Sequence, residues 1–121
     1  MSADVRRPRP APPRPDLVRR PRGAFGWLDA YLLHGGWLAR LGPRAPAVLT
    51  LLAIAADEHG ASYYGRSRMA IMLEMQLHEV DDALDVLVHV GLVAHRPWRP
   101  GCRDGVWQLL PVRRCSDPRM A

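Results

Sequence analysis

Apolar side chains recur at helical spacing in two stretches of the chain. One stripe predicts a helix over residues 43–60, and the other predicts a helix over residues 79–90. The stripes consist of Val48, Leu51, Leu52 and Ala55, and of Val80, Ala83, Leu84, Leu87 and Val88. Pro46 is tolerated in the first turn of the first helix, and Gly60 and Gly91 are suited to ending the two helices.

A further helix is predicted between these two, over residues 68–76, with Ser67 as its N-cap. A short β-prone run at 61–64 precedes it. Because only a tight turn at residues 76–78 separates it from the helix at 79–90, the pair is predicted to form a helix-turn-helix.

The C-terminal half ends in a predicted β-hairpin. Its strands are residues 92–96 and 106–110, and a loop rich in proline, glycine and arginine joins them. Residues 24–41 predict a short strand or turn followed by a short helix, interrupted at Gly35 and Gly36. The expected core includes Val48, Leu52, Leu73, Leu84, Leu87 and Trp107.

The order helix, short strand, helix, turn, helix, strand, loop, strand over residues 25–112 resembles the winged helix-turn-helix family of bacterial, plasmid and phage regulators and replication-initiator domains. The blocks that carry the resemblance are LGPRAPAVLTLLAIAADEHGASYYG, RSRMAIMLEMQLHEVDDALDVLVHVGLV and AHRPWRPGCRDGVWQLL. The resemblance implies a mainly α fold with a small antiparallel β-hairpin, in which a three-helix core carries a wing. It also implies a DNA-binding protein, either a transcriptional regulator or an accessory factor of replication or mobile elements.

Positive charge is concentrated at the N-terminus. Residues 1–22 contain seven arginines and two aspartates, a balance of +5 that equals the net charge of the whole chain. Six prolines interrupt the same stretch, so we expect residues 1–23 to be a disordered arm that follows a nucleic-acid backbone or acts only as a solubilising tail. We expect the folded domain at residues 24–112 and a flexible tail at 113–121.

The third helix of the predicted domain is unusually acidic for a helix that enters a major groove. Acids in its first turn favour the helix dipole, and a carboxylate can accept a hydrogen bond from cytosine, but Asp85 fits the dipole explanation poorly. We therefore assign contact with double-stranded DNA mainly to the arm and the wing. The predicted DNA-binding residues are Arg19, Arg20, Arg66, Arg68, His78, Arg96, Arg99 and Arg103.

The helix at 68–76 is apolar on nearly every side, which gives a second interpretation. Such a surface either lies beneath residues 24–41 or forms a contact with a protein partner or a second copy of the chain. In the second case the chain is a winged-helix interaction module with little DNA binding. Its partner-binding residues would be Met72, Met75, Asp82 and Asp85.

Other function classes receive little support from the sequence. The stretch beginning at His78 and Glu79 starts like a zinc-hydrolase motif but has no second histidine, and no phosphate loop or nucleophile elbow occurs. His95 and Cys102 are too few to predict a metal site. We expect no enzyme activity, no cofactor, no membrane contact and no secretory signal, and a cytoplasmic protein.

Overall fold

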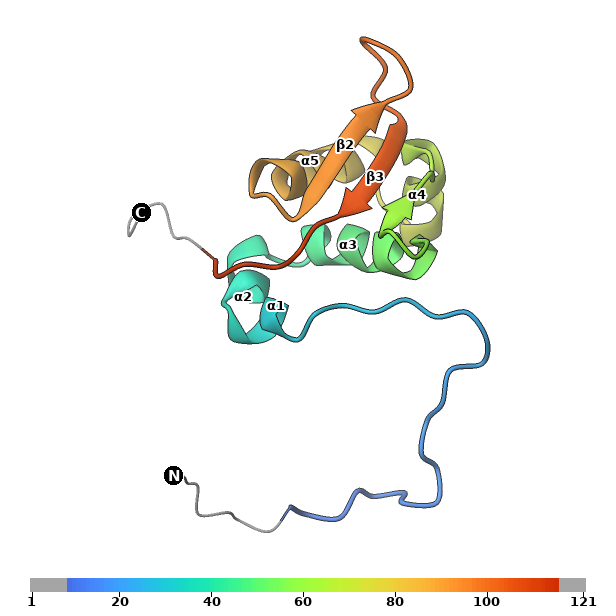
Figure 1. Cartoon of the computed structure of the whole chain (residues 1–121), viewed down its shortest axis with the longest axis vertical. Coiled ribbons are helices and arrows are strands. Elements are labelled where there is room, and N and C mark those ends of the chain that lie inside the picture. The colour runs from blue at the N-terminus through green and yellow to red at the C-terminus, as the bar shows by residue number, and fades with distance from the viewer. Residues whose placement is uncertain (1–8, 116–121) are drawn as a thin grey trace.

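The computed structural model describes residues 9–115, and the first eight and last six residues, including part of the predicted arm and tail, lie outside the described range. Residues 9–22 contain no helix or strand, and all of their side chains are exposed. Figure 1 shows this segment running away from the folded part of the chain. The helices and strands lie between Tyr31 and Leu109.

Two short helices, α1 (Tyr31–His34) and α2 (Trp37–Leu41), open the folded part, with the turn at Gly35 and Gly36 between them. The strand considered near Phe25 is not present in the described residues, which corrects that expectation. Residues 25–29 instead form an irregular segment, here called the strap, that lies against the helix at Arg44–Ala55. Gly26 allows this close approach, because a Cβ atom there would lie 2.0 Å from the carbonyl oxygen of Ala53.

Helix α3 (Arg44–Ala55) is the centre of the fold. Val48 and Leu52 are buried on it, as predicted. The helix ends five residues before the predicted boundary, because the carboxylate of Asp57 accepts hydrogen bonds from the backbone N–H groups of His59 and Ala61 and stabilises a turn there.

Helices α4 (Arg66–Leu73) and α5 (Leu77–His89) form the predicted pair, joined by the short turn at residues 74–76. The prediction of Ser67 as an N-cap is wrong, because α4 begins at Arg66 and Gly65 is its N-cap residue. Helix α5 begins earlier than expected. The Gln76 and Glu79 side chains form a capping box at its N-terminus.

The predicted hairpin is present as β2 (Val93–Pro97) and β3 (Gly105–Leu109), which pair antiparallel with Val93 opposite Leu109. A third strand, β1 (Ala61–Ser62), pairs with the other edge of β3. The resulting sheet has the order β1-β3-β2 and packs against the helices (Figure 1). The coarse prediction of a mainly α fold with a small antiparallel sheet is confirmed.

One core lies between α3, α5 and the inner face of the sheet. Leu84, Leu87 and Trp107 are buried in it, in agreement with the sequence. Leu73 is only half-buried at its edge, and Met69, one helical turn earlier, is the buried residue of α4. Within residues 9–115, the helices are all too short or too polar to cross a membrane.

Candidate nucleic-acid interface

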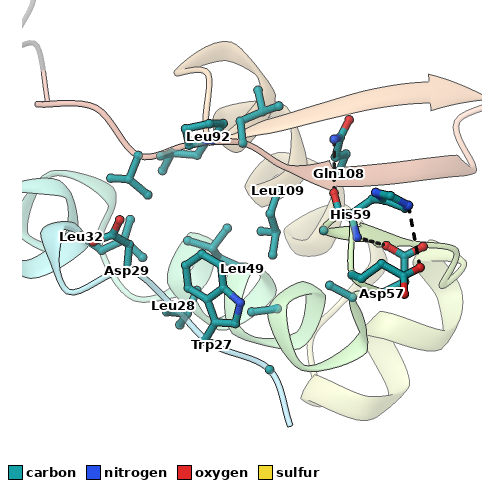
Figure 2. Close-up of a pocket in the computed structure, with 18 of the residues that line it drawn as sticks. Trp27, Leu28, Asp29, Leu32, Leu49, Asp57, His59, Leu92, Gln108 and Leu109 are labelled. Atoms are coloured by element: carbon teal, nitrogen blue, oxygen red, sulfur yellow. Dashed lines mark hydrogen bonds and ion pairs between the residues drawn. The ribbon is translucent and has the colours of Figure 1, made fainter. Parts of the chain in front are cut away.

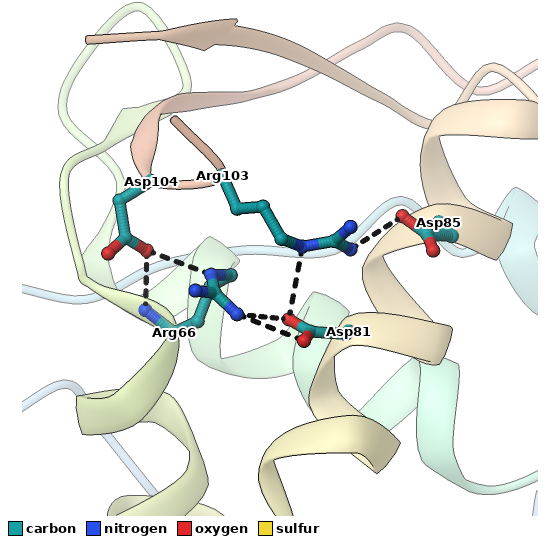
Figure 3. Close-up of polar contacts among 5 residues, drawn as sticks. All are labelled: Arg66, Asp81, Asp85, Arg103 and Asp104. Atoms are coloured by element: carbon teal, nitrogen blue, oxygen red, sulfur yellow. Dashed lines mark hydrogen bonds and ion pairs between the residues drawn. The ribbon is translucent and has the colours of Figure 1, made fainter. Parts of the chain in front are cut away.

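Two of the acidic side chains of α5, those of Asp81 and Asp85, are held by arginines from two other elements (Figure 3). A guanidinium nitrogen of Arg66 donates to both carboxylate oxygens of Asp81, at 2.8 and 2.9 Å. Arg103, in the loop between β2 and β3, donates to Asp85 at 3.1 Å and lies 3.7 Å from Asp81. The face of α5 that turns toward this loop is therefore largely charge-compensated.

Asp104 completes this network at the start of α4. Its carboxylate accepts the backbone N–H of Arg66 at 2.9 Å and lies 3.3 Å from Nε of the same residue. The Arg66 side chain is only 18% exposed, and the hydrogen bond that it donates to Asp81 is the main reason that the pKa of Arg66 is raised. Arg66 thus ties α4 to α5 and to the β2–β3 loop. A phosphate contact by Arg66, which stays a prediction, would have to compete with three existing contacts.

The network explains the acids that the helix dipole could not explain. Asp85 lies in the third turn of α5, too far from the N-terminus for the dipole, but it faces Arg103. Asp82 is exposed and, within residues 9–115, no arginine pairs with it. These contacts were not readable from the sequence, because Arg66 and Asp104 are separated by 38 residues.

The remaining predicted DNA contacts lie on more open surfaces. Arg96 and Arg99 are exposed at the end of β2 and in the β2–β3 loop, and within the described range no carboxylate pairs with either. Arg68, exposed on α4, places its guanidinium 4.8 Å from the centre of the Tyr64 ring. His78 is exposed in the first turn of α5, and Arg19 and Arg20 are exposed in the arm.

An exposed aromatic pair accompanies the arginines of the β2–β3 loop. The rings of Tyr63, which follows β1, and Trp98, which follows β2, are stacked with centroids 6.4 Å apart and an interplanar angle of 13°. Both side chains are more than half exposed. Sequence reasoning treated Trp98 only as a loop residue. The signal in the sequence that could have drawn attention to this aromatic pair was a tryptophan in an otherwise polar loop.

His95 occupies the opposite, inner face of the sheet. Its ring stacks on Trp107 at a centroid distance of 3.7 Å, and its Nε2 atom is buried without a hydrogen-bond partner in the described part of the chain. Burial, and secondarily the charge of Arg103, lowers the pKa of His95. His95 and Cys102 border the same cavity. Residues 9–115, however, contain no group of three or more metal-ligating side chains placed so that they could hold a metal ion.

From this burial we expect the fold to lose stability in acid. With its pKa lowered in the folded protein, His95 is neutral in both states above about pH 6.5, and below that pH the unfolded chain binds the proton more strongly. Stability is therefore expected to fall as pH decreases from 7 to 5. His95→Phe keeps a flat ring on Trp107 and should reduce this loss in denaturant titrations, whereas His89→Gln, at an exposed site, should not.

The apolar surface of α4 is partly uncovered. Ile71 is 77% exposed and Met72 is 52% exposed, while Met75 packs against the core. The interpretation that residues 24–41 cover this helix is wrong for the exposed side, because the strap packs against α3 and α2 lies beside α3. Only Trp37 of the two tryptophans in that segment is buried, and its indole N–H donates to the carbonyl oxygen of Arg113.

A groove opens between the strap, α3 and the chain that follows β3. Its volume is about 730 Å³. Figure 2 shows Leu32 and Asp29 toward one end, Asp57 and His59 at the other end, and Trp27 on the strap beside the opening. This groove could not be predicted from the sequence, because it depends on how the strap lies on α3.

Comparison of the chain with protein-family models, with curated proteins and with solved structures yielded no match. The interpretation of the site therefore rests on the geometry described above.

Proposed function

We propose that residues 24–112 form a winged helix-turn-helix domain that binds double-stranded DNA. The arm and the β2–β3 loop, as the wing, would hold phosphates, and α5 would add little sequence readout. In this proposal the protein is a regulator of transcription or an accessory factor of replication or mobile elements. The proposal is supported by the order of α4, α5 and the β2–β3 hairpin, because winged helix-turn-helix domains place their helices and wing in this order.

The distribution of available positive charge carries the proposal. Three of the four acids of α5 that would repel DNA are paired with arginines, namely Arg44, Arg66 and Arg103. Arg96 and Arg99, in contrast, are exposed without a carboxylate partner in the described residues. Exposed guanidinium groups gain affinity for DNA by displacing condensed counterions. Phosphate contacts of this kind position a protein without reading the base sequence.

Replacing Arg96 and Arg99 together by glutamine tests this function. Loss of two phosphate contacts should weaken binding to duplexes of unrelated sequence by a similar factor and should reduce the slope of log affinity against log salt by about 2. Binding is measured by fluorescence anisotropy over a range of salt concentrations.

The matched control is the replacement of Arg113 and Arg114 by glutamine. This pair removes the same charge at two exposed positions in the segment that follows β3, outside the β2–β3 loop. Equal losses in both variants would indicate a response to net charge alone, and absence of duplex binding by the unmodified chain would refute the function.

The exposed side of α4 supports a second candidate function, a protein-interaction module. Exposed Ile71 and Met72 offer an adaptable apolar contact. The two functions place opposite demands on Asp82 and Asp85. If α5 lies on DNA, replacing both by asparagine should strengthen non-specific duplex binding, by on the order of 1 kcal/mol or less for each acid. If α5 faces a basic protein, the same change should weaken that complex, which a pull-down measures.

A further inference from the structure

The groove described above combines an apolar floor with an acidic rim. Leu49 of α3, Leu92 and Leu109 line the floor. Three carboxylates, those of Asp29, Asp57 and Glu58, form the acidic rim, and no arginine lines the groove. The groove therefore has a chemical preference, for an apolar ligand that carries positive charge.

Aromatic side chains add a second preference. Phe25 and Trp27 on the strap are 68% and 74% exposed, and both border the groove. Exposed aromatic rings beside a groove are the surface on which extended proline-rich segments dock, because such segments lose little conformational entropy on binding. Arginine side chains can in addition stack on an indole ring and pair with carboxylates.

We propose that this groove binds an extended arginine- and proline-rich segment, and that this segment is the chain's own arm, residues 9–22. Those residues include five arginines and five prolines. None of their side chains is buried in the structure, which presents the arm extended and the groove open. Arginines of the docked arm would lie against Asp57 and Glu58, with prolines on Trp27.

The attachment point of the arm favours its own groove over that of another molecule. Gly26 lies against Ala53 and Ile54, close to the end of α3 that leads into Asp57, so the arm leaves the fold near the acidic end of the groove. Gly23 is a bend with open space around it, which permits the chain to turn back. A short flexible connection gives the arm an effective concentration on the order of millimolar at the groove.

Hydrogen bonds within the acidic rim favour the charged form of Asp57. The backbone N–H groups of Ala61 and His59 lower the pKa of Asp57 by donating hydrogen bonds to its carboxylate. Glu58 is 84% exposed, with only a 3.8 Å contact to His59, so its carboxylate can turn toward an incoming guanidinium. Arm and rim therefore attract each other electrostatically, and salt weakens that attraction.

Docking would make the carboxylates of the groove and the phosphates of DNA compete for the arginines of the arm. An arginine paired with Asp57 or Glu58 is not available to a phosphate, so the docked form binds DNA more weakly. This regulatory consequence rests on the proposed function, whereas docking itself does not. The test is therefore made without DNA.

The experiment uses the full chain with Cys102 and Cys115 replaced by serine and a spin label on Ala11→Cys. Docking is expected to reduce the methyl signals of Leu49 and Leu109 in the groove relative to those of Leu84 in the core. Glu58→Arg should restore the groove signals, and Trp27→Ala should do so without a change in charge. Asp82→Arg, the matched charge reversal on α5, should leave the reduction in place.

Equal signal loss in the groove and at Leu84 would overturn the proposal, as would a loss that Glu58→Arg and Asp82→Arg change to the same extent. Mixing spin-labelled chains with isotope-labelled chains that carry no spin label distinguishes the source of the arm. Broadening of the groove signals in the mixture at the strength seen within one chain would overturn docking of the chain's own arm. Because no DNA is present, failure here leaves the duplex-binding test unaffected.

Discussion

Replacing the five arginines of residues 9–22 by glutamine is expected to flatten the salt dependence of duplex binding. Arg14 already forms an ion pair with Asp16, so four arginines are the more accessible contacts. With about 0.9 counterions released for each phosphate contact, the slope of log affinity against log salt should fall by roughly 3 to 4. For four contacts, the affinity that the unmodified chain loses between 50 and 200 mM salt through the arm is about a hundredfold.

Anisotropy titrations at several salt concentrations measure this slope. Replacing the same five arginines by lysine is the matched control, because it preserves charge while removing the planar fork, and it should leave the slope nearly unchanged. A slope that is the same in the glutamine variant and the unmodified chain would remove the arm from DNA binding and leave the wing as its main contact.

The helix pair and the hairpin could be predicted because their signals are local. Val80, Leu84 and Leu87 lie one helical turn apart and are all buried. Gly91 has a φ of +84°, a conformation that glycine adopts without strain, and it ends the turn between α5 and β2. Apolar periodicity and helix-ending glycines depend on residues that are close in the sequence. Both can therefore be recognised in a single sequence.

The strap and the end of α3 could not be predicted in the same way. The aromatic alternation at Phe25 and Trp27 is typical of a strand, but a strand needs a partner, and Gly26 packs against α3 instead of the sheet. The end of α3 depends on Asp57 and the backbone groups of the next turn. Apolar periodicity carries no information on either.

The residues of the candidate site also differ in whether the sequence could predict their roles. Exposure of Arg96 and Arg99 follows from their place beside the turn residues of the wing, so the sequence sufficed to propose them. The roles of Arg66 and Arg103 depend on which carboxylates the fold brings to them, and Asp81 is 15 residues from Arg66 in the chain. The sequence contains these two arginines and the three aspartates that pair with them, but only the fold shows the pairing.

Replacing Arg66 by glutamine is expected to destabilise the fold more than any other single arginine replacement in the described residues. The substitution removes both hydrogen bonds to Asp81 and the ion pair with Asp104, at a site that retains only about a fifth of its solvent exposure. Breaking a fully buried pair costs about 3–5 kcal/mol, and the remaining exposure here reduces the expected cost to about 2 kcal/mol. Denaturant unfolding followed by tryptophan fluorescence measures the change.

The comparison variant is Arg103→Gln, whose arginine is 51% exposed and should cost less than about 1 kcal/mol. A double-mutant cycle of Arg66→Gln with Asp81→Asn should give a coupling energy of about 1–2 kcal/mol, because the two side chains share their contacts. The Arg66→Gln variant also distinguishes a structural role of Arg66 from a role in DNA binding. If Arg66→Gln left stability unchanged and reduced the salt slope of DNA binding by about 1, Arg66 would be a phosphate contact and not a link between α4, α5 and the wing.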